Sequence, residues 1–154
     1  MEITDLRIKP DTEQHLKLRK RLLELDKLVH ELKKWPLNPT TISHVNENIG
    51  QVNSFSGSDH ELQKLVKGAQ KSILKMLEKD LRIVPKHHYR NLWMALGMSV
   101  FGLPLGVAFG ASLSNIAFLS IGLPIGMSVG MAVGAGMDKK ASAEGRQLDF
   151  ELKY

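Results

Sequence analysis

The sequence predicts an all-α membrane protein: a cytoplasmic amphipathic helical bundle or coiled coil, then an antiparallel two-helix transmembrane hairpin, with short strands at the chain ends. Residues 91–137 contain no Asp, Glu, Lys or Arg, and a run of this length suits two membrane spans of about 20 residues each. Glycine recurs at every fourth position in two parts of this run. Each part therefore has a smooth helix face against which another helix can pack closely.

The distribution of charge divides the chain into three parts. All of the net charge of +5 lies before residue 91, whereas the last part carries equal numbers of acidic and basic side chains. We expect a cytoplasmic helical domain (1–90), a two-span hairpin (91–137) and a cytoplasmic tail (138–154). The first residues lack the basic and apolar regions of a secretory signal, so the first domain is expected to stay on the side of synthesis. The absence of cysteine excludes disulfides and thiolate metal sites.

Apolar residues spaced by three and four predict three amphipathic helices in the first domain, over about residues 11–35, 41–54 and 58–84. Pro85 is expected to close the third helix. The first helix carries a heptad seam of Leu18, Leu22, Leu25, Val29 and Leu32. Such a seam can form the core of a monomeric bundle or drive cytoplasmic oligomerisation, and the sequence leaves both open.

Each predicted helix has a start signal. Asp11 is expected to cap the first helix, and Thr40 or Thr41 the second. Ser58 with Glu61 three residues later predicts a capping box at the start of the third helix.

The two ends of the chain predict short strands. Residues 2–8 alternate weakly, with Thr4, Leu6 and Ile8 on one side, and residues 147–154 alternate clearly between apolar and charged side chains. An isolated strand leaves its backbone unpaired. We therefore predict that the two ends pair, within one chain or between chains.

The hairpin is predicted to consist of spans at about 91–112 and 116–137, joined by an uncharged turn. Basic residues flank the outer ends of both spans, so the positive-inside rule places both termini in the cytoplasm. We expect these flanking residues to contact anionic lipid headgroups. They are Lys86, His87, His88 and Arg90 before the first span, and Lys139 and Lys140 after the second.

Two glycine ladders are the candidate helix-packing residues. The motif at 102–106, Gly-Leu-Pro-Leu-Gly, recurs at 122–126 as Gly-Leu-Pro-Ile-Gly, so the two spans are similar. The ladders consist of Gly102, Gly106 and Gly110 in the first span and Gly122, Gly126, Gly130 and Gly134 in the second.

Over about residues 97–136 the chain resembles the glycine-zipper motif of small bacterial membrane proteins and of some channel and pore proteins. The resemblance implies an integral protein of the bacterial inner (plasma) membrane that assembles into a homo-oligomer, with helices ringed around a pore. The alternative is plain packing, in which the two spans close on each other and nothing passes. The spans hold no ionisable residue, which argues against a proton relay or a charged selectivity ring.

Two functions remain after these observations. The first is a small self-assembling integral membrane protein that forms a pore, a channel or a membrane-permeabilising assembly. The alternative is a non-conducting membrane anchor or scaffold whose cytoplasmic helices recruit a partner protein. A hairpin buried inside a soluble monomer is disfavoured, because too few other residues are available to cover two apolar helices.

The sequence predicts no catalytic, cofactor or metal site. Residues 126–130 match the nucleophile pattern G-x-S-x-G, but they lie in an apolar helix and no histidine follows Ser128. His87 and His88 are adjacent, and headgroup contact explains them better than a metal. A stripe of lysines along the third helix predicts a solvated face or contact with anionic lipid or an acidic partner; nucleic acid is not expected. The stripe consists of Lys64, Lys67, Lys71, Lys75 and Lys79.

Overall fold

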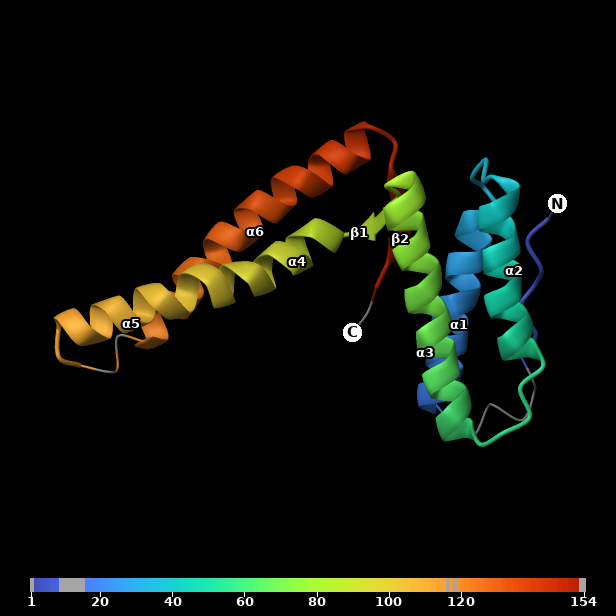
Figure 1. Cartoon of the computed structure of the whole chain (residues 1–154), viewed down its shortest axis with the longest axis horizontal. Coiled ribbons are helices and arrows are strands. Elements are labelled where there is room, and N and C mark those ends of the chain that lie inside the picture. Colours follow the sequence, from blue (N-terminus) through green and yellow to red (C-terminus); the bar gives the residue numbers. More distant parts are fainter. Residues whose placement is uncertain (1, 9–15, 116, 118, 153–154) are drawn as a thin grey trace. The chain divides into compact units, whose positions relative to one another are not determined.

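The computed structural model of the chain is mostly helical and describes residues 2–8, 16–115, 117 and 119–152. The chain divides into two compact units (Figure 1). The first unit contains the chain up to Val84 together with Leu148–Phe150. The second unit contains Pro85–Gln147 and the last residues of the chain.

The first unit is built on three helices, α1 (Leu16–Leu32), α2 (Pro39–Asn53) and α3 (Asp59–Met76). Helix α3 packs against both α1 and α2 (Figure 1). The apolar seams predicted from the sequence face this core, because spacings of three and four place residues on one helix face. Fully buried side chains include Leu25, Leu28, Leu32, Val45, Ile49, Val66 and Ile73.

The helix starts agree with the sequence at one position and differ at another. The capping box is present: the Ser58 hydroxyl accepts from the Glu61 N–H, and the Glu61 carboxylate accepts from the Ser58 N–H at 3.1 Å. Helix α2 starts earlier than expected. Its cap is Asn38, whose Oδ1 accepts from the N–H of Thr41 at 2.7 Å, so the prediction of a threonine cap is wrong. Pro39 occupies the first helical position, where its missing N–H costs nothing. The predicted cap Asp11 lies outside the described residues.

The N-terminal segment, residues 2–8, forms no strand. It lies along α2 with Ile3 and Leu6 buried, each 9% exposed. The expected face of Thr4, Leu6 and Ile8 is therefore wrong, because Thr4 and Ile8 are exposed. Buried side chains three residues apart indicate a chain that turns by about a third of a revolution per residue, not the period of two of a flat strand.

The third helix ends differently from the prediction. Helix α3 continues as a π-helical turn, η2 (Leu77–Leu81), and Arg82 then adopts a left-handed conformation with φ 55°. Pro85 belongs to a short strand, β1 (Val84–Lys86), that pairs with β2 (Gln147–Glu151). The alternation after residue 147 thus predicts a strand correctly, but its partner is β1 and not the N-terminal segment.

The second unit is a helical hairpin. Its first arm runs from His88 to Ser112 as α4 (His88–Leu96), a π-helical segment η3 (Gly97–Gly102) and α5 (Leu103–Ser112). Its second arm is α6 (Leu119–Ala143), which packs along all three parts of the first arm (Figure 1). Both arms are long and apolar enough to cross a membrane by length and composition. Helix α6 continues past residue 137 and so includes the charged residues that follow the predicted span.

Candidate functional site: a glycine seam and the basic pocket at its end

The two arms of the hairpin meet through glycine. Between His88 and Ser112, the buried residues are Gly97, Gly102 and Gly106. On α6 the buried positions recur every four residues and include Gly122, Gly126, Gly130 and Gly134. We call these seven residues the glycine seam.

Backbone touches backbone along the glycine seam. A methyl group placed on Gly126 would lie 2.7 Å from the Cα of Gly102, and one on Gly122 would lie 2.6 Å from the Cα of Gly106. Further along α6, a methyl group on Gly130 would lie 3.1 Å from the Cα of Met94. The obstructing atoms are main-chain atoms that cannot rotate away. A side chain at these positions would push the arms apart.

The seam includes one glycine that the sequence pattern did not indicate. The expected ladder of the first arm was Gly102, Gly106 and Gly110, whereas the structure uses Gly97, Gly102 and Gly106. Gly110 is only half-buried, and its carbonyl oxygen accepts from the N–H of Asn115 at the turn.

The shift has a physical cause in the π-helical segment. The N–H of Leu103 bonds to the carbonyl of Met98, five residues back, so this turn holds one extra residue. Gly97 and Gly102, five residues apart, therefore share a face. Pro104 follows directly and has no N–H to donate, and the wider turn gives its ring more room. In α6 the matching Pro124 lies inside a continuous α-helix, so the two copies of the repeat differ in backbone.

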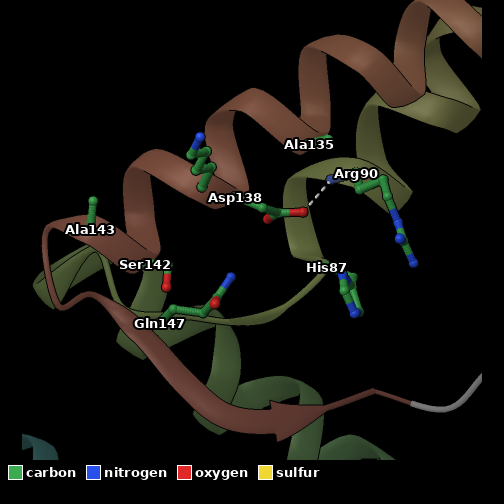
Figure 2. A pocket seen from close by; sticks show the side chains of 8 residues that line it. His87, Arg90, Ala135, Asp138, Ser142, Ala143 and Gln147 are labelled. Carbon is green, nitrogen blue, oxygen red and sulfur yellow. Dashed lines mark hydrogen bonds between the residues drawn. The ribbon is translucent and has the colours of Figure 1, made fainter.

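The four-residue spacing of α6 continues from Gly134 to Asp138. This carboxylate is 7% exposed and accepts hydrogen bonds from the backbone N–H groups of Tyr89 and Arg90, both at 3.0 Å. Figure 2 shows the bond to Arg90. These groups belong to the first turn of α4. The residue before that helix, His87, has φ 60° and makes no side-chain cap. Asp138 therefore supplies from α6 the cap that the local sequence lacks.

A pocket of about 530 Å³ lies beside Asp138. Figure 2 shows His87 and Arg90 on the α4 side and Asp138 and Ser142 on α6. The lining residues are His87, Arg90, Ala135, Asp138, Lys139, Ser142, Ala143 and Gln147. We call this site the basic pocket.

Three of the six predicted headgroup residues, His87, Arg90 and Lys139, line the basic pocket. The other three lie elsewhere. Lys86 is exposed on β1, the His88 ring packs edge-on against Tyr89, and Lys140 lies 4.0 Å from a Glu144 oxygen.

The groups that line the basic pocket suit non-covalent binding of an anion. Both oxygens of Asp138 already face N–H groups at the positive end of the α4 dipole, so part of its charge is compensated internally. Arg90 and Lys139 supply basic side chains, and Ser142 and Gln147 add neutral hydrogen-bonding groups. Phosphate oxygens fit this combination of groups.

The described residues also include one serine–histidine contact that sequence reasoning missed. The Ser72 hydroxyl on α3 lies 3.4 Å from His44 Nε2 on α2, and Asn48 Nδ2 lies 3.4 Å from His44 Nδ1. Asn48 Nδ2 also donates to the His44 carbonyl, so an amide donor faces Nδ1. This arrangement leaves the ring proton on Nε2, which is the wrong tautomer for a base that activates the serine. The contact therefore joins α2 to α3 and gives no indication of acyl transfer.

No group of three metal-ligating side chains occurs within the described part of the chain. The lysines of the predicted stripe are all exposed, four on α3 and Lys79 on η2. Comparison of the chain with protein-family models, with curated proteins and with solved structures finds no match.

Proposed function

We propose that the protein is a membrane anchor: the hairpin crosses the bilayer twice and holds the three-helix unit at the cytoplasmic surface, where it recruits a partner protein. The observation that carries the proposal is the composition of the two sides of the hairpin. The side between the arms is the glycine seam, whereas large apolar side chains point outward. Outward residues include Val100, Phe101, Leu103, Leu105, Val107, Phe109, Ile121, Ile125, Val129 and Val133.

This arrangement suits lipid better than water. Only 17% of the apolar window in the first arm and 22% of that in the second are buried. In water each of these partly exposed Leu, Val, Ile or Phe side chains would forgo part of the roughly 1.5–3 kcal/mol that full burial provides. Lipid tails surround such side chains favourably, and close backbone packing then holds the arms together by dispersion.

The positions of the charged groups support one orientation. The basic pocket and the basic residues around it lie at the end of the hairpin where the chain enters and leaves, and the turn around Ser114 carries no charge. The positive-inside rule then keeps both termini in the cytoplasm, next to anionic headgroups of a bacterial inner membrane.

An anchor is favoured over a pore because the glycine faces are already occupied. Gly122, Gly126 and Gly130 contact the other arm of the same hairpin and are not available to a neighbouring copy. Residues 91–137 also hold no charged side chain, which argues against a charged path for ions.

Accessibility of single cysteines tests the proposal, because the chain has no native cysteine. We expect Ser112→Cys, next to the turn, to react with a membrane-impermeant maleimide added outside intact spheroplasts. Gln51→Cys, exposed on α2, should react only after lysis. Equal labelling of both positions in intact cells would contradict the topology. Recovery of the protein in the detergent-free supernatant after high-speed centrifugation would contradict membrane insertion.

Self-assembly is the second candidate, and one observation favours it. Ser128, Ala132 and Gly136 form a second four-residue stripe on α6, and all three are exposed. A methyl group on Gly136 would meet no atom within 4 Å. This stripe is free for a neighbouring copy, as a homo-oligomer or pore requires.

Ala132→Leu tests self-assembly separately from hairpin closure. If copies pack through the stripe of Ser128, Ala132 and Gly136, Ala132→Leu lowers the oligomer mass in mild detergent and abolishes dye leakage from liposomes. A monomeric mass for the unmodified protein, with tight liposomes at high protein density, would exclude the pore and leave the anchor.

A further inference from the structure

The N-terminal segment is held by side-chain amides of α2. Asn46 Nδ2 donates to the carbonyl oxygen of Glu2 at 2.9 Å, and its Oδ1 accepts from the N–H of Thr4 at 2.7 Å. These are the two backbone groups that flank Ile3 and that a neighbouring parallel strand would bond. The amide therefore takes the place of one residue of a partner strand.

Asn53 repeats this contact three residues further along the segment. Its Nδ2 donates to the carbonyl oxygen of Asp5 at 3.0 Å, and its Oδ1 accepts from the N–H of Arg7 at 2.8 Å. These two groups flank Leu6. Toward the described residues of the segment both asparagines thus bond main-chain atoms, which any peptide carries.

The spacing of the two amides matches the spacing of the segment. Asn46 and Asn53 are two turns apart on one face of α2, about 10.5 Å along the axis. Three residues of nearly extended chain span about 10 Å. Gly50 lies between the two amides on the same face, and a methyl group there would meet no atom within 4 Å.

Three side chains of the N-terminal segment also contact the helices. Ile3 and Leu6 are buried, and Asp5 pairs with Lys33 at the end of α1. The Lys33 hydrogen bond and charge lower the pKa of the Asp5 carboxyl below its ordinary value. The segment therefore presents two buried apolar side chains three residues apart, with a carboxylate directly before the second.

A pocket of about 420 Å³ continues from the Ile3 end of the segment. Besides Glu2, Ile3 and Lys33, its walls include Leu32, Trp35, Pro36, Leu37 and Ile42. Apolar and aromatic walls next to a main-chain clamp are typical of peptide-binding sites.

We propose that the α2 face carrying Asn46 and Asn53 is a binding site for an extended segment of a partner protein, and that residues 2–8 are a built-in competitor for it. The partner segment carries two apolar residues three apart and an acidic residue before the second. Release of residues 2–8 breaks five solvent-exposed hydrogen bonds, including the one between Lys33 and Asp5, and uncovers two side chains. The site does not require that the hairpin cross a membrane.

Binding of a labelled peptide of residues 1–8 to the full chain in mild detergent tests the proposal. The unmodified chain should bind it weakly, because the attached segment competes at a high effective concentration. Ile3→Ser with Leu6→Ser in the chain weakens the competitor and should tighten binding at least tenfold. In that background Asn46→Leu or Asn53→Leu, each removing two hydrogen bonds, should weaken binding roughly tenfold. Asn48→Leu, on the same helix but bonded to His44, is the control and should change it little.

A charge exchange separates recognition from folding. Lys33→Glu in the chain should weaken binding of the natural peptide about two- to fivefold, as expected for an exposed ion pair, and restore binding to a peptide with Asp5→Lys. Binding of the natural peptide to the unmodified chain at high peptide concentration provides a second measurement that leaves the competitor intact. The proposal would be overturned if neither the Ile3→Ser, Leu6→Ser chain nor the unmodified chain bound the peptide, or if Asn46→Leu and Asn53→Leu left binding unchanged. A doubled mass of the unmodified chain that Asn46→Leu abolishes would assign the site to a second copy instead of a partner.

Discussion

The carboxylate of Asp138 accepts the backbone N–H of Arg90 at 3.0 Å, so a side chain from α6 closes the first turn of α4 (Figure 2). A second oxygen of the same carboxylate accepts the N–H of Tyr89. This residue is the only charged one in the buried row that otherwise consists of glycines from Gly122 to Gly134. It therefore fixes the lengthwise register of two arms whose glycine faces could otherwise slide past each other.

Asp138→Ala should destabilise the hairpin by about 1–2 kcal/mol, because it leaves two N–H groups of α4 without an acceptor. Asp138→Asn keeps one acceptor oxygen and should cost about half as much. Thermal unfolding in mild detergent, followed by circular dichroism, measures both. Met137→Ala is the control, since Met137 is one residue earlier and exposed. Equal midpoints for Asp138→Ala and Met137→Ala would show that the cap does not hold the arms.

The basic pocket should bind phosphatidylglycerol in preference to phosphatidylcholine. Arg90→Gln and Lys139→Gln should each weaken that preference by about 1 kcal/mol, or roughly fivefold in affinity. Lys140→Gln removes the same charge next to the pocket but outside its lining, and should have a smaller effect. Native mass spectrometry of the detergent-solubilised protein titrated with each lipid gives the affinities. Equal losses for Lys139→Gln and Lys140→Gln would indicate a diffuse surface charge and no pocket.

The two adjacent histidines should respond in opposite directions to glycine. His87 has φ 60°, a conformation that costs a side-chain-bearing residue about 1–3 kcal/mol, so His87→Gly should raise stability by about 1 kcal/mol while weakening lipid binding. His88 is the first residue of α4 and its ring packs against Tyr89, so His88→Gly should lower stability by up to about 1 kcal/mol. The midpoint of thermal unfolding distinguishes them. A stability loss for His87→Gly would mean that its ring contributes more than its backbone costs.

Local sequence patterns predict much of the fold. The heptad spacing predicts the helices of the first unit, and the box of Ser58 with Glu61 and the strand after Gln147 are present as expected. The box depends on contacts within a few residues, and the helices and the strand are indicated by the apolar periodicity of their own residues, although β2 also needs β1 as its partner. Such local patterns can therefore be recognised from the sequence alone.

Long-range contacts explain what the sequence did not reveal. The roles of Asn46 and Asn53 could not be recognised in the sequence, because their hydrogen bonds join α2 to residues more than forty positions earlier. Gly97 was not predicted as a packing residue, because a spacing of four residues assumes a regular α-helix. In the π-helical turn the spacing between Gly97 and Gly102 is five residues. Asp138 continues the spacing from Gly134 and could have been found, had the ladder not been restricted to glycine.

Glu31 should make the docking of β2 dependent on pH. This carboxylate accepts from Lys34 and from the N–H of Asp149 at 3.1 Å, and these bonds, the first being the stronger cause, lower its pKa below the ordinary value of 4.5. A group with a lowered folded pKa stabilises the fold fully above the unfolded pKa. That stabilisation is lost as the pH falls through the lower, folded pKa.

We therefore expect hydrogen-exchange protection of the Asp149 and Phe150 amides to be constant above about pH 5 and to fall below pH 4.5. Intrinsic exchange rates must be corrected for pH. Glu31→Gln keeps a neutral acceptor and should flatten this dependence, with lower protection at neutral pH. If protection in Glu31→Gln falls with acid as steeply as in the unmodified chain, another group is responsible.

Alanine at two glycines of α6 should separate seam packing from helix propensity. Gly126 and Gly136 lie on the same helix, but a methyl group at Gly126 would meet the backbone of Gly102 at 2.5 Å from its nitrogen, whereas one at Gly136 meets nothing within 4 Å. Both substitutions gain up to about 1 kcal/mol of intrinsic helix preference. At Gly126 the arms must separate to admit the methyl group, which loses dispersion contacts along the whole seam. We expect Gly126→Ala to lower the unfolding midpoint in detergent and Gly136→Ala to leave it unchanged or raise it. If Gly126→Ala is as stable as Gly136→Ala, the arms are not held in backbone contact.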